Sequence, residues 1–307
     1  MEIIREKIDF QLDNKTAVAI GKFDGVHNGH ALILNKLKEY RDKGLKTAVL
    51  TFDFPPSMTL TNAPAQVLTT NIEKRLIFRE MGVDIMVEFP FYEKTAMISA
   101  EDFIEDILVG QMKMAAVVVG EDCAFGHKAA GNADLLKKMG DKFGYETVVI
   151  PKLKDGDEVI SSTYLRELII EGKVAKVASL SPNPYFVYGD FKTTGGIGQK
   201  FGLPFCVMDI PEDKLLPRDG VYMTKVLYED CYYPSISFVL ERKRCIETYM
   251  YEGTRDIGRE SVAIGFFEFL RDSFENDDTA FISQEKRIEQ FRLELEKGRG
   301  WHREHPV

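Results

Sequence analysis

The sequence predicts an α/β domain with a doubly wound parallel sheet, followed by a small antiparallel β-barrel with a C-terminal helix. The first prediction rests on residues 16–172, where short apolar runs alternate with amphipathic segments of helical period, as in parallel strands joined by helices. The second rests on the chain after Tyr185, where short β-type runs follow one another without intervening helices. We therefore expect two domains, residues 1–182 and 183–307.

Strand and helix signals alternate along the first domain. The expected strands are an edge strand at residues 3–4 and buried strands at 17–20, 45–54, 85–89, 114–120 and 146–150. Thr70 and Ser99 are expected to cap helices, while Gly82 and Gly144 are expected to end them. A further helix is expected to start within the segment ISSTYLREL at 160–168.

The second domain contains short strands with glycine and proline turns between them. An amphipathic helix at 283–297 follows the strands, and the last ten residues show no pattern and are expected to fray. Residues 173–185 separate the two domains and are expected to be mostly loop.

The composition is that of a globular protein. The 307 residues are 44% hydrophobic and 29% charged, with a formal net charge of −9. Nucleic acids and acidic membranes prefer basic surfaces, so we expect neither as a partner. The four cysteines are scattered and no apolar run has signal-peptide or membrane-spanning length. We expect a cytoplasmic protein with reduced thiols, as a monomer or a weak homo-oligomer.

The stretch GKFDGVHNGH carries the clearest chemical signal. It joins a short apolar strand to an amphipathic helix, and the free backbone N–H groups of a helix start bind phosphate. His27 and His30, close to Gly29, can stabilise the charge that develops in phosphoryl or nucleotidyl transfer. Two other interpretations stay open. The histidines could be ordinary turn residues, or they could bind zinc, although no further ligand of suitable spacing follows.

Two more stretches of the first domain carry groups that bind phosphate or line a site. ISSTYLREL places Ser162 and Thr163 at a helix start and Arg166 one turn later, and hydroxyls, amides and a guanidinium together can hold phosphates. VVVGEDCAFG places Asp122 directly after a buried strand, at the same sheet end as His27. Taken alone, each stretch is better explained as a helix or turn cap; found together with GKFDGVHNGH in the same α/β unit, the ISST stretch favours a phosphate site.

These motifs resemble those of the prokaryotic FAD synthetases, members of the HxGH nucleotidylyltransferase superfamily with a Rossmann-like fold. GKFDGVHNGH and ISST-x-Leu-Arg resemble the two signatures of the family, and TFDFPP resembles its flavin-side segment. The matches run through most of residues 16–185. In three places the sequence departs from the family pattern: Lys22 replaces the usual asparagine, Cys123 replaces an aromatic residue, and Pro56 follows Pro55 where a histidine is common between two prolines.

The resemblance implies an FMN adenylyltransferase, which transfers AMP from ATP to FMN and gives FAD and pyrophosphate. It implies His27, His30 and Arg166 as catalytic residues. The residues that it implies for ATP binding are Gly21, Phe23, Asp24, Gly25, His27, His30, Ser162, Thr163 and Arg166, and those for flavin binding are Phe54, Asp122 and Phe125. The FMN phosphate is itself a nucleophile. We expect ATP and FMN as small-molecule partners and Mg²⁺ held by substrate oxygens and water, without a dedicated protein metal site.

The second domain resembles the riboflavin kinase module of the same family, and Glu247 falls on the position of its catalytic base. The kinase pattern Gly-Phe-Pro-Thr-Ala-Asn reads GLPFCV here, and Phe205 and Val207 offer no oxygen ligand for Mg²⁺. We therefore expect a barrel that is inactive as a kinase, with Glu247 as a vestigial residue. Periodicity alone favours an exposed strand carboxylate at Glu247.

Three alternatives to a monofunctional FMN adenylyltransferase remain. The chain could be a bifunctional riboflavin kinase/FMN adenylyltransferase, or a flavin-binding regulatory protein with little turnover. The histidine motif alone is also compatible with another nucleotidyl acceptor, such as a phosphocholine- or pantetheine-type compound.

Overall fold

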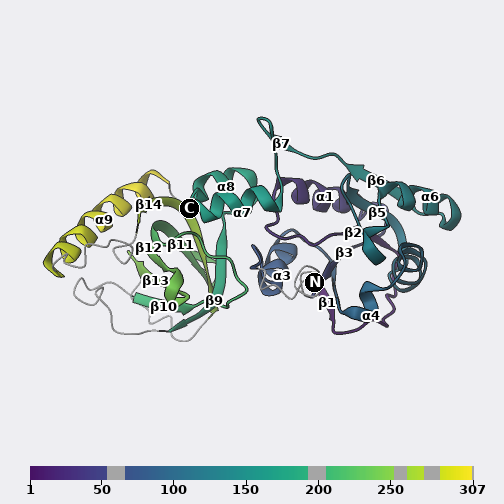
Figure 1. The fold of residues 1–307 in the computed structure, drawn as a ribbon, viewed down its shortest axis with the longest axis horizontal. Coiled ribbons are helices and arrows are strands. Elements are labelled where there is room, and N and C mark those ends of the chain that lie inside the picture. Colours follow the sequence, from purple (N-terminus) through teal and green to yellow (C-terminus); the bar gives the residue numbers. More distant parts are fainter. Residues whose placement is uncertain (54–65, 193–204, 252–260, 273–283, 306–307) are drawn as a thin grey trace. The chain divides into compact units, whose positions relative to one another are not determined.

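The computed structural model of the chain describes residues 1–53, 66–192, 205–251, 261–272 and 284–305 (Figure 1). The chain divides into two compact units, Met1–Tyr164 and Leu165–Val307. This division lies earlier than the boundary at residue 182 that the sequence predicts. One reason is α8 (Val174–Leu180), which packs against β14 (Ser261–Arg271) of the second unit.

The first unit contains a parallel sheet of six strands. In spatial order these are β1 (Glu2–Arg5), β4 (Ile85–Phe89), β3 (Lys46–Phe52), β2 (Thr16–Ile20), β5 (Met114–Gly120) and β6 (Glu146–Ile150). The chain moves from β2 toward β3 and β4, whereas from β5 it moves to β6 in the opposite direction. The strand order therefore reverses between β2 and β5, and doubly wound sheets bind ligands at the carboxyl ends of the strands at such a point.

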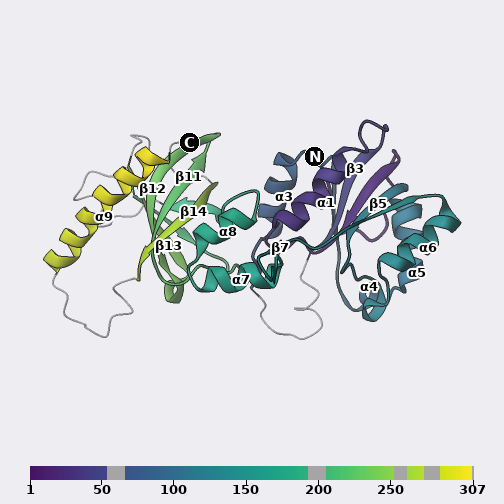
Figure 2. The ribbon, with the colours of Figure 1, turned by 90° about the horizontal axis from the view of Figure 1, so that it is seen from above.

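Helices cover both faces of this sheet, as predicted (Figure 2). On one face lie α1 (Asn28–Lys38) and α3 (Asn71–Glu80), and on the other α4 (Glu93–Ala96), α5 (Ala100–Asp102) and α6 (Ala133–Phe143). The predicted caps are present: Thr70 forms a capping box with Glu73, and Ser99 accepts the backbone N–H of Asp102. After α5 the chain continues as a π-helix, η1 (Phe103–Gln111), which the sequence does not predict.

Two features near the boundary of the units are not predicted from the sequence. A short hairpin, β7 (Lys154–Asp155) with β8 (Glu158–Val159), precedes α7 (Ser162–Ile170). The helix α8 replaces part of the loop expected at 173–185. None of the helices in the described part of the chain is long and apolar enough to cross a membrane.

The second unit contains the predicted antiparallel barrel, and it is closed. Its strands, in spatial order, are β10 (Phe205–Asp209), β13 (Cys245–Met250), β12 (Cys231–Leu240), β11 (Gly220–Tyr228), β14 and β9 (Phe186–Lys192). Four fully buried hydroxyls from three of these strands form a chain: Thr224 bonds to Ser235 and Ser237, and Ser237 bonds to Thr248, each at 2.8 Å.

The C-terminal helix α9 (Gln284–Glu304) contacts β12 of the barrel (Figure 1). Leu295 packs with Val221, Ile236 and Tyr249. The helix is longer than the predicted 283–297, so the expectation of a frayed tail is wrong. Its last turns are stabilised by tertiary contacts, because His302 Nε2 lies 3.1 Å from the carbonyl oxygen of Ser235.

Candidate active site

A cavity of about 1240 Å³ opens in the first unit at the carboxyl ends of β2, β3, β5 and β6. This is the edge where the strand order reverses. The predicted site residues that line it are Gly21, Phe23, His27, His30, Asp122, Phe125, Ser162 and Thr163. The structure thus brings together residues that are up to 142 positions apart in the chain (21 to 163).

His27 and His30 lie together at the start of α1. His27 is the N-cap residue, and its Nδ1 accepts the backbone N–H of His30 at 3.4 Å. The two rings stack with centroids 3.9 Å apart and planes inclined by 22°. A Cβ on Gly29 would lie 3.0 Å from His27 Nδ1, so a glycine leaves room for this ring. Because Nδ1 accepts, the proton of the neutral His27 ring resides on Nε2, which makes that atom a donor.

Both histidines are neutral in the free site. Burial lowers the pKa of His27 to about 4, against a smaller opposing effect of Asp122. Desolvation lowers the pKa of His30 well below its ordinary value, and interaction with His27 and Lys74 lowers it further. Neutral imidazoles in a cavity are hydrogen-bond donors, and approaching phosphates favour their protonated form.

Lys74 is a buried cation beside the histidine pair that the sequence does not single out. It lies in α3, and burial lowers its pKa while the carboxylates of Asp24 and Glu88 oppose this effect. Glu88 also holds Arg75 through two contacts of 2.6 Å. Helical periodicity could not identify Lys74, because a single lysine on an apolar face usually extends its amine to solvent.

Asp24 and Gly25 shape the loop behind the cavity and are not among its described lining residues. The Asp24 carboxylate accepts the backbone N–H of Thr69, and the Gly25 N–H donates to the Thr69 hydroxyl, both at 2.9 Å. The Ser162 hydroxyl donates to the carbonyl oxygen of Asp24 at 2.7 Å. Ser162 therefore joins the start of α7 to the histidine loop, which is a positional role in addition to the predicted phosphate contact.

Asp122 and Lys152 form an ion pair at the ends of β5 and β6, with Oδ2 and Nζ 3.4 Å apart. Both line the cavity, together with Cys123. Burial raises the pKa of the Cys123 thiol to about 12, so this group is not a thiolate nucleophile. Within the described ranges, no group of three or more His, Cys, Asp or Glu side chains could hold a metal ion.

An apolar wall of the cavity comes from segments that the sequence does not connect with the site. Phe52, Phe91 and Met97 line it, and Met97 is 62% exposed. Phe125 also lines the cavity but is only 4% exposed, because its ring packs against Phe103.

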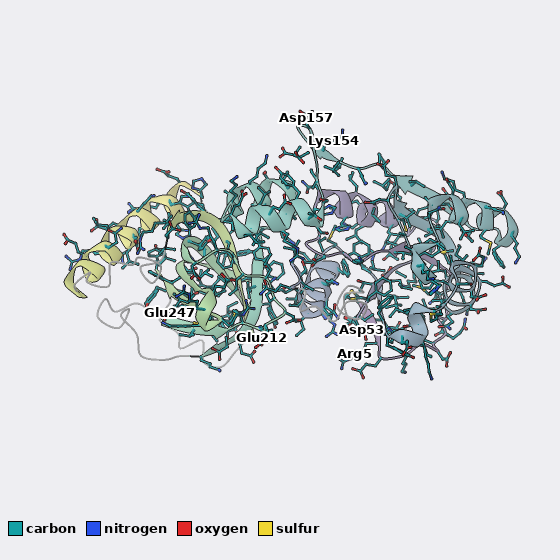
Figure 3. All side chains as sticks on the ribbon, in the orientation of Figure 1. Arg5, Asp53, Lys154, Asp157, Glu212 and Glu247 are labelled. Carbon is teal, nitrogen blue, oxygen red and sulfur yellow. The ribbon has the colours of Figure 1, made fainter. Side chains whose placement is uncertain are left out.

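Three predicted residues lie elsewhere. Phe54 falls outside the described residues. Arg166 is on α7, one turn after Ser162, but belongs to the second compact unit. Glu247 is on β13 of the barrel (Figure 3), half-buried and in register with Val207 and Phe238 on the neighbouring strands.

Comparison with known proteins covers both units. A family model described as FAD synthetase matches residues 9–164, and one described as riboflavin kinase matches residues 181–292. A bifunctional riboflavin kinase/FMN adenylyltransferase of Listeria monocytogenes is 32% identical over 91% of each chain. A protein of the same description from Buchnera aphidicola subsp. Schizaphis graminum is 26% identical, over 93% of this chain and 94% of the other.

The fold of the whole chain also has a solved counterpart. A crystal structure described as a macrolide-efflux protein from Streptococcus pneumoniae has a TM-score of 0.81 over 98% of both chains, at 24% sequence identity, which shows a shared fold. The family models and the relatives agree with the two units of the structure. The chain therefore belongs to the family of bifunctional riboflavin kinase/FMN adenylyltransferases, with an FAD synthetase module followed by a riboflavin kinase module.

Proposed function

We propose that the cavity of the first unit binds ATP and FMN together and transfers AMP to the phosphate of FMN, giving FAD and pyrophosphate. The observation that carries this proposal is the stacked pair of neutral imidazoles at a helix start, inside a cavity at the reversal point of the sheet. The FAD synthetase module matched over residues 9–164 supports it.

The reaction requires alignment and charge stabilisation more than a protein nucleophile. An oxygen of the FMN phosphate forms a bond to the α-phosphorus of ATP, and the bond from that phosphorus to the leaving pyrophosphate breaks. Two anions must be held together in line, and negative charge grows on the transferred group. His27 donates from Nε2 to the α-phosphate, and His30 stacks beneath it and stabilises the developing charge. The thiol state of Cys123 agrees with a mechanism that has no covalent enzyme intermediate.

The pyrophosphate side is assigned to the start of α7. Thr163 lines the cavity, and Ser162 ties this helix to the histidine loop. Arg166 follows one turn later, and its guanidinium is suited to bidentate contact with phosphate oxygens. We assign the β- and γ-phosphates of ATP to these three residues.

Mg²⁺ would enter with the phosphates of ATP and neutralise part of their charge. The carboxylates on the cavity wall are Glu93 and Asp122, and Asp122 is already paired with Lys152. Such a sparse donor set fits a metal held mainly by phosphate oxygens and water, as is common for Mg²⁺. Asp122 is the residue we assign to orient this hydrated ion on the flavin side of the cavity.

For the barrel, we propose that riboflavin kinase activity is lost or greatly reduced. The ground is chemical: Phe205 and Val207 stand where the family has threonine and asparagine, and Val207 lies directly across from Glu247. The comparisons give no support to this loss, because the riboflavin kinase model matches the barrel and the curated relatives described above carry the bifunctional name. The bifunctional enzyme is therefore the second candidate function.

Product analysis tests both proposals in one experiment. The full chain is incubated with ATP and Mg²⁺, with FMN in one reaction and riboflavin in another, and flavins are resolved by chromatography. FAD from FMN alone supports both proposals. FMN and FAD from riboflavin would establish the bifunctional enzyme, and no product from either flavin would favour a binding protein or another nucleotidyl acceptor. The cytoplasmic location and oligomeric state expected from the sequence stay predictions.

A further inference from the structure

One imidazole on the cavity wall has no part in the proposed transfer. This is His127, the first residue of the short helix η2 (His127–Ala129). Its backbone N–H donates to the carbonyl oxygen of Ile98 at 2.7 Å, and its ring Nδ1 lies 3.0 Å from the carbonyl oxygen of Ala96. The segment that follows α4 therefore holds this residue at two points.

The backbone before His127 is also fixed. Gly126 has a φ of +73°, and a Cβ at this position would lie 2.6 Å from Ala100 Cα. Only glycine combines that backbone conformation with so close an approach. The position of the His127 ring is thus determined by the surrounding chain before any ligand binds, which is what a specificity contact requires.

The contact with Ala96 determines which ring nitrogen carries the proton. A carbonyl oxygen only accepts, so Nδ1 of His127 donates, and Nε2 of the neutral ring is then an acceptor. His27 has the reverse arrangement, because its Nδ1 accepts from His30. The two imidazoles therefore offer opposite hydrogen-bonding partners to a ligand: a donor at His27 and an acceptor at His127.

The cavity wall on the side of His127 combines apolar side chains with two charged ones, Glu93 of α4 and Lys128. Phe91, Met97 and Phe125 line the same cavity, and the last two belong to the segments that carry the Ala96 and His127 contacts. A fixed acceptor beside aromatic and thioether side chains suits a flat, mostly apolar ring with an N–H donor. Of the two proposed substrates, the isoalloxazine ring of FMN with its imide N–H has this chemistry.

We infer that His127 is a specificity-determining residue that accepts, at Nε2, a hydrogen bond from the imide N–H of the FMN ring. This inference rests on the proposed function, since another nucleotidyl acceptor would present a different donor. It adds a residue that neither the sequence motifs nor the transfer chemistry require.

The test compares FMN with 3-methyl-FMN, in which a methyl group replaces the imide hydrogen. FAD formation by the full chain is measured for the parent and for His127→Phe. The matched control is His305→Phe, at the residue that directly follows α9 in the second unit. Loss of one hydrogen bond predicts a kcat/KM for FMN about 3- to 10-fold lower in His127→Phe. The variant should also discriminate less between the two flavins than the parent, while its KM for ATP should not change.

Three outcomes would overturn the inference. His127→Phe could weaken both flavins equally, it could raise the KM for ATP instead, or the parent could use both flavins equally well. Quenching of flavin fluorescence on binding separates this inference from the proposed function. If no FAD forms but the parent still binds FMN more tightly than 3-methyl-FMN and His127→Phe does not, the transfer proposal fails and the His127 contact stands. If neither flavin binds, both fail.

Discussion

The interior of the barrel and the cavity of the first unit bury polar side chains in different ways. Inside the barrel, the hydroxyls of Thr224, Ser235, Ser237 and Thr248 bond to one another. At the cavity of the first unit, no partner among the described residues lies against the buried Nδ1 of His30. Polar groups that satisfy one another hold a fold together, whereas a buried group without a partner is available to a ligand. Burial alone therefore does not separate structural from functional residues. A missing partner does not do so alone either, because Tyr251 Oη and His302 Nδ1 of the second unit also lack one among the described residues; His30 differs in that it also lines a cavity.

Substitution of His30, the unpartnered residue of this comparison, should have the largest effect on activity. His30→Ala should lower the turnover of FAD formation by ~10²–10³, the scale for loss of one preorganised charge-stabilising group. Turnover is measured with FMN and ATP, and His305→Ala serves as the control histidine of the second unit. Parent-like turnover in His30→Ala would place the reaction outside the cavity.

Substitution of Arg166 is expected to have the next largest effect, and this effect should be on the KM of one substrate, ATP. Arg166→Ala should raise the KM for ATP by about 10- to 100-fold, since charge-assisted hydrogen bonds to phosphate would be lost. Steady-state kinetics with each substrate varied in turn give both KM values, and Arg166→Lys tests whether charge alone suffices. A larger rise in the KM for FMN would assign Arg166 to the flavin side.

The hydroxyl chain of the barrel should affect stability without affecting chemistry. Ser237→Ala leaves Thr224 and Thr248 each without one partner, which should cost about 1–3 kcal/mol of the free energy of unfolding. Denaturant unfolding of the parent and the variant, followed by a signal from the second unit, measures this cost. FAD formation from FMN should stay unchanged. Adding Thr248→Val removes one of the orphaned groups and should restore part of the loss. A further loss of stability would show that these four side chains stabilise the barrel by packing and not by their hydrogen bonds.

The lowered pKa values of the histidines predict a pH-dependent stability. His27 has a pKa of about 4 when folded against an ordinary 6.5, so the unfolded chain binds more protons between these values. The stability is complete above pH 6.5 and falls as the pH drops toward 4, by about 2 kcal/mol for His27 at pH 5. Thermal melts across this range measure the loss. His302 in the second unit has the same direction of shift.

The variant His27→Asn/His30→Asn tests the source of this pH dependence. Asparagine at position 27 keeps an N-cap acceptor but does not titrate. The loss of stability between neutral pH and about pH 5 should therefore be smaller in this variant, with a residual contribution from His302. An unchanged pH profile would show that other groups determine it.

Glu247 should give the smallest effect. If the barrel is inactive as a kinase, Glu247→Gln should change FAD formation from FMN by less than about twofold, the range of surface substitutions away from a site. The same assay with riboflavin is the sharper measurement. A riboflavin-dependent product in the parent that disappears in Glu247→Gln would establish a working kinase and remove the contrast between the units.

Most of the fold could be predicted because its local signals agree with one another. The buried strand β5 is a continuous apolar run, and Thr70 and Ser99 begin helices where their sequence context predicts. The failures occur where tertiary contacts decide. The last turns of α9 form because His302 reaches the barrel, and η1 follows α5 with a hydrogen-bonding period that no residue pattern specifies.

The candidate site was predictable in part for the same reason. His27, His30 and Ser162 belong to compact motifs, so the sequence identifies them. Met97 and His127 come from segments that meet only in the folded chain, and Lys74 is buried by its surroundings. His127 follows Phe125-Gly126 directly, so the predicted flavin segment was the signal that could have led to it.

The N-cap role of His27 has a consequence for how this site can change. The ring nitrogen that accepts the His30 N–H also determines which nitrogen faces the substrates. Replacements that preserve the helix start, such as asparagine, are too short to reach a phosphate, and longer ones lose the cap. Formation of the first turn of α1 therefore also sets the orientation of the His27 ring in the active site. A chain in which this turn unravels therefore loses the arrangement of the two imidazoles as well as the helix start.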